Sequence, residues 1–342
     1  MSEQRVTMKD VAKAAGVTTA AVSYAISGKR PISDETRKRV EAAIKELGYT
    51  PNMAARTLSS AGRSSKLIGV VVPQTEGGGR LMCQNQFYAE ILGSIELCAR
   101  QAGYHVLISA TDANDGYLTL AAERNLDGII VIGMYPDEFY QQMKRSRIPI
   151  VLIDSYCNDH YYHNVRIDDA YGSYLATKYV LERGHRDIAF FCGRIKDNGV
   201  MKKRLAGYRD ALGEYSVEFR DALVFEGDID YKDGIESANR LMDTQVNATA
   251  VVAAADILAI GAAKAFYERG VRVPDDISLM GFDDLEISQY LTPGLTTVRQ
   301  QISLKGEKAV ELLIRSINEP ELTKQELILP VSLVERESVK RI

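Results

Sequence analysis

The sequence predicts a small all-α head of the helix-turn-helix type, followed by a larger α/β body with two lobes. Short helical patterns separated by glycines fill the first 50 residues. From residue 67 onward, apolar runs of strand length alternate with helical patterns, which is typical of parallel, doubly wound sheets built from βαβ units. Because these runs outnumber the strands of one ordinary sheet, we expect two lobes, with a ligand cleft at the carboxyl ends of their strands.

Charge supports a division between head and body. Residues 1–66 contain 12 Lys and Arg against 6 Asp and Glu, whereas the rest of the chain contains 30 against 40. A basic head is therefore attached to an acidic body, within a chain of formal net charge −4. An excess of positive charge on a small domain suits a polyanion such as DNA, although a solvated helical face could carry the same excess.

The composition argues against several other classes of protein. The chain has 342 residues, of which 46% are hydrophobic and 26% charged, and no apolar run approaches the ~18 residues that cross a bilayer. The first residues lack the apolar stretch of a secretory signal, so we expect a cytoplasmic protein. The cysteines lack a CxxC pair or a nearby histidine at metal-ligand spacing, so we expect reduced thiols, no metal and no cofactor: Cys83, Cys98, Cys157 and Cys192.

The first helix of the head should begin at Met8. Thr7 and Asp10 have the spacing of a capping box, in which two side chains satisfy free backbone amides at the start of a helix. Gly16 stands where this helix must end. The apolar residues of the segment fall on one helical face: Val11, Ala12 and Ala15.

Two further helices should complete the head. Thr18 is a good N-cap for a second helix over Thr19–Ser27, and Ser33 for a third over Asp34–Leu47. The first two helices, joined through a glycine, make a helix-turn-helix, and the third closes its core. In such a motif the second helix enters the major groove, where we expect base contacts from its first residues: Thr19, Ala20, Ser23 and Tyr24. Phosphate contacts should come from flanking residues: Thr18, Lys29, Arg30 and Arg37 with its neighbours Lys38 and Arg39.

A short helix-prone segment, residues 53–60, follows the head. It is too short to hold a helix alone in water, so we expect it to fold against a partner. Ala54 and Ala55 are small enough for two copies to cross closely, and Leu58 would then project as an apolar wedge able to part a base step in the minor groove. A plain linker is the alternative interpretation.

These stretches resemble the lactose-repressor (LacI/GalR) family of bacterial transcription regulators. The matching residues are 8–17, 22–23, 33–40 and 47–52, together with Ala55 and Leu58 in the short segment that follows. The resemblance implies that Leu58 intercalates at the centre of a palindromic operator, and that Asn52 and Ala55 belong to the same DNA-binding surface. Ala20 and Tyr24 stand where many members have larger polar or basic residues, so the operator half-site cannot be taken from the family.

The ends of the apolar runs in the body supply candidate ligand contacts. Asp154, Asp256 and Asp283 each close or follow such a run, and Arg204 opens a helical pattern after another. Carboxylates combined with an arginine fork can hold the vicinal hydroxyls of a sugar-like molecule. Three more aspartates follow such runs and are further candidates: Asp168, Asp169 and Asp284. Each of these six aspartates could instead cap the next helix.

The body resembles the effector domain of the same family, which is itself similar to periplasmic sugar-binding proteins. The matching stretches are 184–186, 204–208, 256–261, 273–278, 281–284 and 295–298. This correspondence favours Arg204 and Asp283 as effector contacts. Three residues depart from relatives that bind sugars, where an asparagine and stacking aromatic rings are common: Ala255, Ile229 and Ile302.

The expected organisation assigns each segment a part. We place the head at residues 1–50, the hinge and linker at 51–66, and the effector-binding and dimerisation body at 67–342. We expect an N-lobe of about 67–167 and 299–328, and a C-lobe of about 168–298 and 329–342. Phe87 and Tyr88 should lie at the cleft rim, after a glycine-rich stretch that forms either a lid or a disordered surface loop.

Nothing in the sequence favours catalysis. No nucleophile elbow, P-loop or HExxH pattern is present, and the glycines lack the dinucleotide fingerprint. His160 and His163 lie close together in a tyrosine-rich turn, where a metal or acid–base site is an alternative to an ordinary surface turn.

The resemblance implies a repressor of a carbohydrate-utilisation operon that binds its operator as a homodimer. Paired heads require a two-fold axis, and the sequence has no leucine heptad tail that would build a tetramer. A sugar is the expected effector, and a nucleoside or purine is an alternative. A sugar phosphate is another, because basic residues gather near the expected cleft: Arg194, Lys196, Lys202, Lys203 and Arg204. Rival classes are a solute-binding protein and an enzyme on the same scaffold.

Overall fold

A computed structural model gives two compact units, residues 1–65 and 66–342. The structure describes residues 6–27, 32–49, 64–73, 85–111, 124–133, 135–145, 148–156, 161–196, 199–244 and 247–342. The expected hinge and most of the expected lid lie outside these residues.

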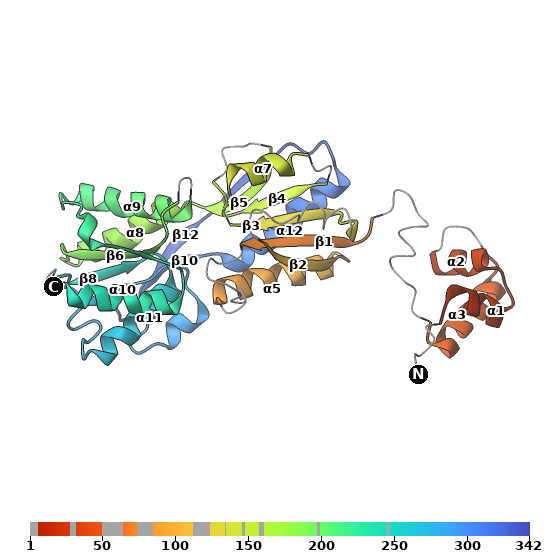
Figure 1. Cartoon of the computed structure of the whole chain (residues 1–342), viewed down its shortest axis with the longest axis horizontal. Coiled ribbons are helices and arrows are strands. Elements are labelled where there is room, and N and C mark those ends of the chain that lie inside the picture. The colour runs from red at the N-terminus through yellow and green to blue at the C-terminus, as the bar shows by residue number, and fades with distance from the viewer. Residues whose placement is uncertain are drawn as a thin grey trace. The chain divides into compact units, whose positions relative to one another are not determined.

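The head contains three described helices, α1 (Met8–Ala15), α2 (Thr19–Ser27) and α3 (Asp34–Leu47) (Figure 1). Their starts have the predicted caps. Both the backbone amide and the hydroxyl of Thr7 donate to the Asp10 carboxylate, and the Thr18 and Ser33 hydroxyls accept backbone amides of the first turns of α2 and α3. The glycines that follow α1 and α3 are left-handed, with φ of +63° and +59°, a conformation that costs glycine little. The predicted boundaries of these helices are therefore confirmed.

A small core holds the three helices together. Val11, Val22 and Val40 contribute one fully buried side chain from each helix. Tyr49 packs against them after the last helix. With each helix burying one face, the opposite faces are left to solvent or to a partner.

The first part of the body is built around a six-stranded sheet in the order β11-β5-β4-β3-β1-β2, all of whose pairs are parallel. Its strands are β1 (Leu67–Pro73), β2 (His105–Thr111), β3 (Gly128–Ile132), β4 (Ile150–Ile153), β5 (His163–Ile167) and β11 (Glu326–Leu329). Alternate residues of β1 enter two different cores, Val70 facing α5 (Gln86–Gln101) and α12 (Ile302–Asn318), and Val71 facing the side of α7 (Asp137–Met143). We call this sheet with α5, α7 and α12 the N-lobe.

The second part is built around a four-stranded parallel sheet in the order β7-β6-β8-β9. Its strands are β6 (Ile188–Gly193), β7 (Val224–Gly227), β8 (Ala250–Ala253) and β9 (Ser278–Met280). Four helices accompany it: α8 (Asp169–Glu182), α9 (Val200–Glu214), α10 (Tyr231–Asp243) and α11 (Asp256–Glu268). Phe190 and Phe191, adjacent on β6, enter the two separate cores on either face of this sheet. We call this sheet with its helices the C-lobe.

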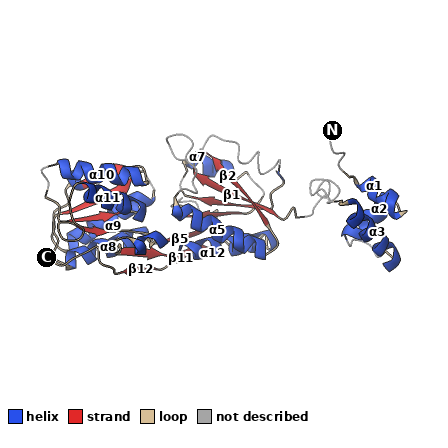
Figure 2. Cartoon of the chain, turned by 90° about the horizontal axis from the view of Figure 1, so that it is seen from below, coloured by secondary structure: helices blue, strands red, loops and turns tan. Residues whose placement is uncertain are grey.

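Short strands lie where the chain passes between the lobes. An antiparallel pair, β10 (Thr297–Gln300) and β12 (Val331–Val334), lies beside α8, whereas β11, just before β12, pairs with β5 in the N-lobe (Figure 2). The strand β5 was not expected as a full strand, because its polar side chains hide the apolar pattern. No described helix is long and apolar enough to cross a membrane.

Candidate functional site

Three carboxylates stand where strands of the body end. Asp154 follows β4, Asp283 follows β9, and Asp169 begins α8 just after β5. All three are buried, with 8%, 5% and 1% of their surfaces exposed. Asp154 and Asp283 have positive φ angles of 54° and 122°, which residues other than glycine seldom adopt. Strained backbone at strand ends is frequent in binding sites, where surrounding contacts hold it in place.

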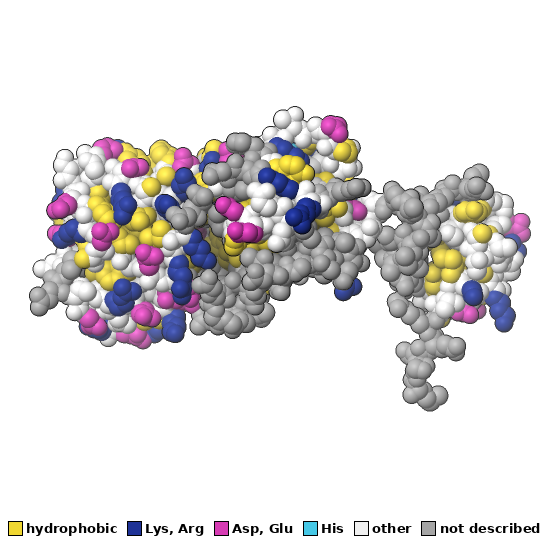
Figure 3. Space-filling model, turned by 45° about the horizontal axis from the view of Figure 1, so that its top comes forward, with side chains coloured by type: hydrophobic (Ala, Val, Ile, Leu, Met, Phe, Trp, Pro, Cys, Tyr) yellow, Lys and Arg dark blue, Asp and Glu magenta, His cyan; other side chains and the backbone are white. Residues whose placement is uncertain are grey.

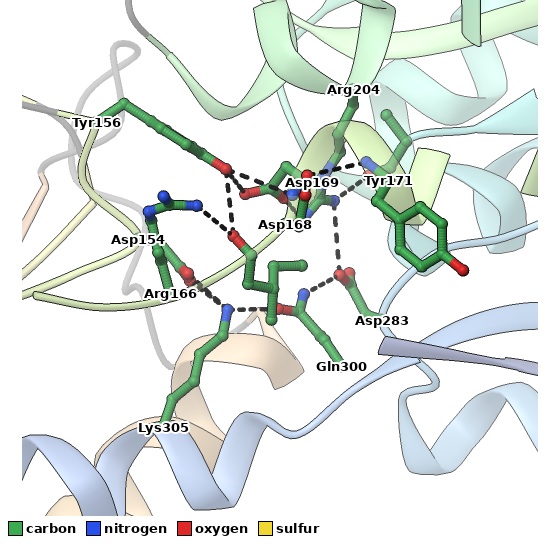
Figure 4. A network of polar contacts seen from close by, with 12 residues as sticks. Asp154, Tyr156, Arg166, Asp168, Asp169, Tyr171, Arg204, Asp283, Gln300 and Lys305 are labelled. Atoms are coloured by element: carbon green, nitrogen blue, oxygen red, sulfur yellow. Dashed lines mark hydrogen bonds and ion pairs between the residues drawn. The ribbon is translucent and has the colours of Figure 1, made fainter. Parts of the chain in front are cut away.

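Lys305, in the first turn of α12, is fully buried among these carboxylates (Figure 4). Its ammonium donates to both oxygens of Asp154, at 2.6 and 2.7 Å, and to the side-chain oxygen of Gln300 at 2.5 Å. The amide nitrogen of Gln300 donates in turn to Asp283 at 2.5 Å. Because Gln300 faces a cation with its oxygen and an anion with its nitrogen, the orientation of its amide is fixed by its neighbours.

Arg204 contributes the second buried cation, from α9. Its Nε and Nη2 both lie 2.8 Å from the same oxygen of Asp169, its Nη1 donates to the backbone oxygen of Ala254, and Asp283 is 3.6 Å away. The guanidinium lies 3.7 Å from the centre of the Phe282 ring. Burial opposes its charge, but Asp169 and Asp283 outweigh burial and raise the pKa of Arg204.

Hydrogen bonds and ion pairs thus join both lobes in one network (Figure 4). The network runs from Asp154 through Lys305, Gln300, Asp283 and Arg204 to Asp169. Asp169 also accepts the hydroxyl of Tyr156 at 2.7 Å. Burial raises the pKa of Asp154, and it raises the pKa of Asp283 to about 6 although Arg204 opposes the rise. We call these residues, with Tyr156, the cleft network.

Aromatic residues line the N-lobe side of this network. The Phe87 ring lies 5.6 Å from the Lys305 ammonium and contacts Tyr88 edge to face. Burial, with the charges of Asp154 and Asp283, raises the pKa of Tyr88, which therefore stays a neutral phenol. The Tyr135 hydroxyl is buried and has no hydrogen-bond partner among the described residues. Five predicted contacts thus fall in or beside the network: Phe87, Tyr88, Asp154, Arg204 and Asp283.

The prediction for Asp256 needs correction. Its carboxylate is completely buried and accepts the Leu285 amide at 2.8 Å and the hydroxyls of Ser288 and Thr297 at 2.6 Å each. Burial raises its pKa to about 7, with a further contribution from Asp283. With three donors already bound, Asp256 ties the segment after β9 to β10 beneath the cleft network and is not a free ligand contact.

Other carboxylates and a histidine have structural partners. Asp168 caps α8 by accepting the Tyr171 amide at 3.0 Å, and Asp284 pairs with Arg299 and Arg336 at 2.7 Å each. His163 was expected in a surface turn but is fully buried in β5. Its Nδ1 accepts the Gln325 amide, so its Nε2 donates to Ser316 and cannot act as a base. His160 lies outside the described residues.

Three members of the cleft network were not predicted from the sequence: Tyr156, Gln300 and Lys305. Asp168 and Asp169 were both strand-end candidates, and the structure places Asp169 in the network, whereas Asp168 caps α8. Lys305 lies in an amphipathic helical pattern, where a lysine normally marks the solvent face, and no sequence signal distinguishes it from the partly exposed Lys308 three residues later.

The head presents a second candidate site. Thr18, Thr19 and Ala20 are exposed at the start of α2, with Ser23 and Tyr24 half-buried one turn later. Basic side chains lie on the described surface of the head (Figure 3). Arg37, Lys38 and Arg39 are exposed at the start of α3. Five predicted DNA contacts lie outside the described residues: Lys29, Arg30, Asn52, Ala55 and Leu58.

Comparisons with known proteins agree with this architecture of a DNA-reading head and a two-lobed ligand domain. Residues 7–52 match the model "Bacterial regulatory proteins, lacI family", and residues 177–339 match "Periplasmic binding protein-like domain". The chain is 33% identical to the ribose operon repressor of Haemophilus influenzae over 97% of its length and 98% of that protein. It is 36% identical to the transcriptional repressor PurR of Klebsiella pneumoniae over 97% and 96%.

Solved structures give the same result. A lac repressor dimer bound to operator and an anti-inducer matches with a TM-score of 0.84 at 28% identity, over 98% of this chain and all of that one. A cellobiose complex of the transcriptional regulator CelR matches with a TM-score of 0.72 at 30% identity, over 98% and 100%. The fold and sites thus define a ligand-responsive, DNA-binding transcriptional repressor. The chain belongs to the LacI family.

Among the described residues, no group of three or more acidic, histidine or cysteine side chains could hold a metal ion.

Proposed function

We propose that this chain represses a carbohydrate-utilisation operon in the cytoplasm, binding a palindromic operator as a homodimer whose affinity depends on a sugar in the cleft network. The observation that carries the proposal is the network itself, in which buried donors and acceptors from both lobes converge. Relatives named for ribose and cellobiose support a sugar. A regulatory and not an enzymatic role is supported by relatives named as repressors.

In this proposal the head reads the operator through α2. The side chains at its start would meet base edges in the major groove: Thr19, Ala20, Ser23 and Tyr24. Phosphate contacts would fix the register without choosing the sequence: Thr18, Lys29, Arg30, Arg37 and Asn52. Ala55 would let two hinge segments approach closely, and Leu58 would part the central base step.

The cleft network supplies a route for the effector to act. Asp154 and Lys305 come from N-lobe elements, whereas Arg204 comes from the C-lobe, and Gln300 connects them from β10. A ligand that exchanges hydrogen bonds with groups from both lobes binds one lobe arrangement better than another. Such a difference in affinity is what shifts a conformational equilibrium, and through the segment between head and body it would change operator binding.

A phosphorylated effector is less well supported. Of the five basic residues that suggested it, only Arg204 is buried. Arg194 pairs with Asp228 at the surface, and three lysines are exposed: Lys196, Lys202 and Lys203. A purine remains the second candidate, because relatives named PurR match over nearly the whole chain.

The test is operator binding measured by fluorescence anisotropy, using duplexes from the control region upstream of the chain's own gene. Nanomolar binding that a neutral sugar strengthens or weakens at least tenfold would support the proposal. The absence of specific binding at low salt, or operator binding that responds to none of a panel of sugars, sugar phosphates and purines, would refute it.

A further inference from the structure

The segment after β9, residues 281–288, reaches three different parts of the body within four residues. The Phe282 side chain is buried in a core of the C-lobe, with residues of α8 and α9. Asp283 belongs to the cleft network. The Leu285 side chain, 1% exposed, is buried in the core of the N-lobe with residues of α5 and α12. We call residues 281–288 the bridge segment, because they connect both lobes with the cleft network.

Asp256, the first residue of α11, holds the bridge segment in place. One oxygen of its carboxylate accepts the backbone amide of Leu285 at 2.8 Å and the hydroxyl of Ser288 at 2.6 Å. The other oxygen accepts the hydroxyl of Thr297, on β10, at 2.6 Å. The backbone amide of Asp256 donates to the carbonyl oxygen of Phe282 at 2.6 Å. The backbone of Leu285 is therefore fixed by a C-lobe carboxylate, whereas its side chain is fixed by the N-lobe core.

The backbone of the bridge segment requires such support. Asp283 and Asp284 have positive φ angles of 122° and 58°, a conformation that residues other than glycine keep only where surrounding contacts hold it. Gly281 leaves no space between this backbone and Asp256, because a Cβ there would overlap an oxygen of the carboxylate. The segment consequently has little freedom to move independently of Asp256.

The role of Asp256 differs from that of a ligand contact. Its carboxylate is completely buried and already bonded to three donors. An aspartate that only filled space in a core would cost more free energy than an apolar side chain, since a buried charge must be compensated by partners. Its partners lie on the bridge segment and on β10, the two stretches that bring Asp283 and Gln300 into the cleft network.

We infer that Asp256 is a positioning residue that connects the cleft network to the core of the N-lobe. Because it holds the bridge segment as one unit, a displacement of Asp283 by a ligand is passed to Leu285, two residues further along the chain. Close-packed cores transmit such displacements, since they contain few voids that could absorb them. In a ligand-responsive repressor this gives the cleft a route to the N-lobe that does not pass through Gln300 and Lys305. The inference depends neither on the identity of the ligand nor on the operator.

The test is a double-mutant cycle on the full-length chain without ligand, with the free energy of unfolding measured by urea titration at about pH 8.5. At this pH Asp256 is ionised, since burial raises its pKa only to about 7. If Asp256 positions Leu285, removal of the carboxylate should already loosen the packing of Leu285. Leu285→Ala should therefore cost no more than about half as much free energy of unfolding in an Asp256→Ala background as in the wild type. Equal costs in the two backgrounds would overturn the inference.

Leu312→Ala is the matched control. Leu312 is 2% exposed in the same N-lobe core but belongs to α12 and not to the bridge segment. Its replacement should cost the same in both backgrounds, because the effects of independent sites are additive. A reduction as large as that for Leu285→Ala would show that Asp256→Ala loosens the whole lobe, and the specific positioning role would then be wrong.

Asp256→Asn separates the geometry of the anchor from its charge. The oxygen of an asparagine can accept from the Leu285 amide and the Ser288 hydroxyl, and its nitrogen can donate to the Thr297 hydroxyl, which accepts as well as donates. Leu285→Ala should then cost as much as it does in the wild type. A cost as low as in Asp256→Ala would mean that the charge, and not the position of the bridge segment, is what matters, contrary to the inference.

Ser288→Ala serves where Asp256→Ala does not fold. It removes one of the three donors and leaves the carboxylate bonded to the Leu285 amide and the Thr297 hydroxyl. Leu285→Ala should cost less free energy of unfolding in this background than in the wild type. An unchanged cost would count against the positioning role.

The connection to the cleft is tested by a third change. Asp283→Asn removes a charge from the cleft network, and its effect on stability should be coupled to that of Leu285→Ala in the wild type. In the Asp256→Ala background the two effects should become additive. Coupling that persists there would show that the lobes communicate through Gln300 and Lys305 instead, and additive effects in the wild type would show no communication between these sites. Either result would overturn the inference.

Discussion

Replacement of Arg204 by methionine tests whether the cleft network also stabilises the body. The change removes a buried guanidinium that two carboxylates face, at 2.8 Å from Asp169 and 3.6 Å from Asp283. Asp169 would then lose its cation and retain the hydrogen bond from the Tyr156 hydroxyl. Removing one partner of a buried ion pair typically costs about 3–5 kcal/mol, because the remaining charge stays in a poorly solvated site. For a domain of this size, that cost lowers the melting temperature by roughly 6–20 °C.

The assay is thermal unfolding of the full chain followed by circular dichroism, with Arg209→Met as the matched control. Arg209 lies on the same helix, but its side chain is half-exposed and its ion pair with Asp221 measures 3.7 Å. Loss of such a surface pair should change stability by less than about 1 kcal/mol. If Arg204→Met and Arg209→Met melted within 2 °C of each other, the buried ion pairs of Arg204 would not stabilise the body.

Three other predictions follow from packing, protonation and charge. Gly207→Ala should destabilise the body by about 3 kcal/mol or more, because the new Cβ would lie 1.9 Å from a backbone carbonyl oxygen of α8. Gly213→Ala, on the same helix, places its Cβ in open space and should raise the stability of the body by up to about 1 kcal/mol. Similar urea midpoints for the two variants would contradict this. Burial lowers the pKa of His163 to about 4, so the fold resists its protonation and stability should fall as pH drops from 6.5 towards 4, by up to ~1.4 kcal/mol per pH unit. In a His163→Gln variant the melting temperature should fall less steeply with decreasing pH than in the wild type. An equally steep fall in the two proteins would show that other groups cause the acid sensitivity. Arg37→Ala should weaken binding to all duplexes alike and reduce the slope of log affinity against log salt by about one, and a loss confined to one sequence would show base recognition instead.

The head could be read almost completely from its sequence. Its helix boundaries depend on local chemistry, in which a hydroxyl satisfies free amides at one end and a glycine accepts a left-handed turn at the other. Thr7, Thr18 and Ser33 mark the starts, and Gly16 and Gly48 mark the ends. Such interactions span only a few residues, so the local sequence is enough to predict the helix boundaries.

The ligand site was only partly predictable. Asp154 and Asp283 could be found because a polar residue that ends an apolar run must lie at the carboxyl edge of a parallel sheet. The same rule selected Asp256, which the fold buries under three hydrogen-bond donors. A strand end fixes where a side chain starts, but the neighbouring elements decide whether its oxygens remain available.

The sequence by itself determined the basic helical head and the alternating strands and helices of the body, because these follow from local periodicity and spacing. Its resemblance to known regulators indicated the family. Only the tertiary structure decided which charges are buried. Lys305 and Asp154 are 151 positions apart and yet form an ion pair at 2.6 Å, whereas Lys308, three residues further along the same helix, stays near the surface. The cost of burying a charge depends on the partners that the fold brings to it, and those partners come from distant parts of the chain.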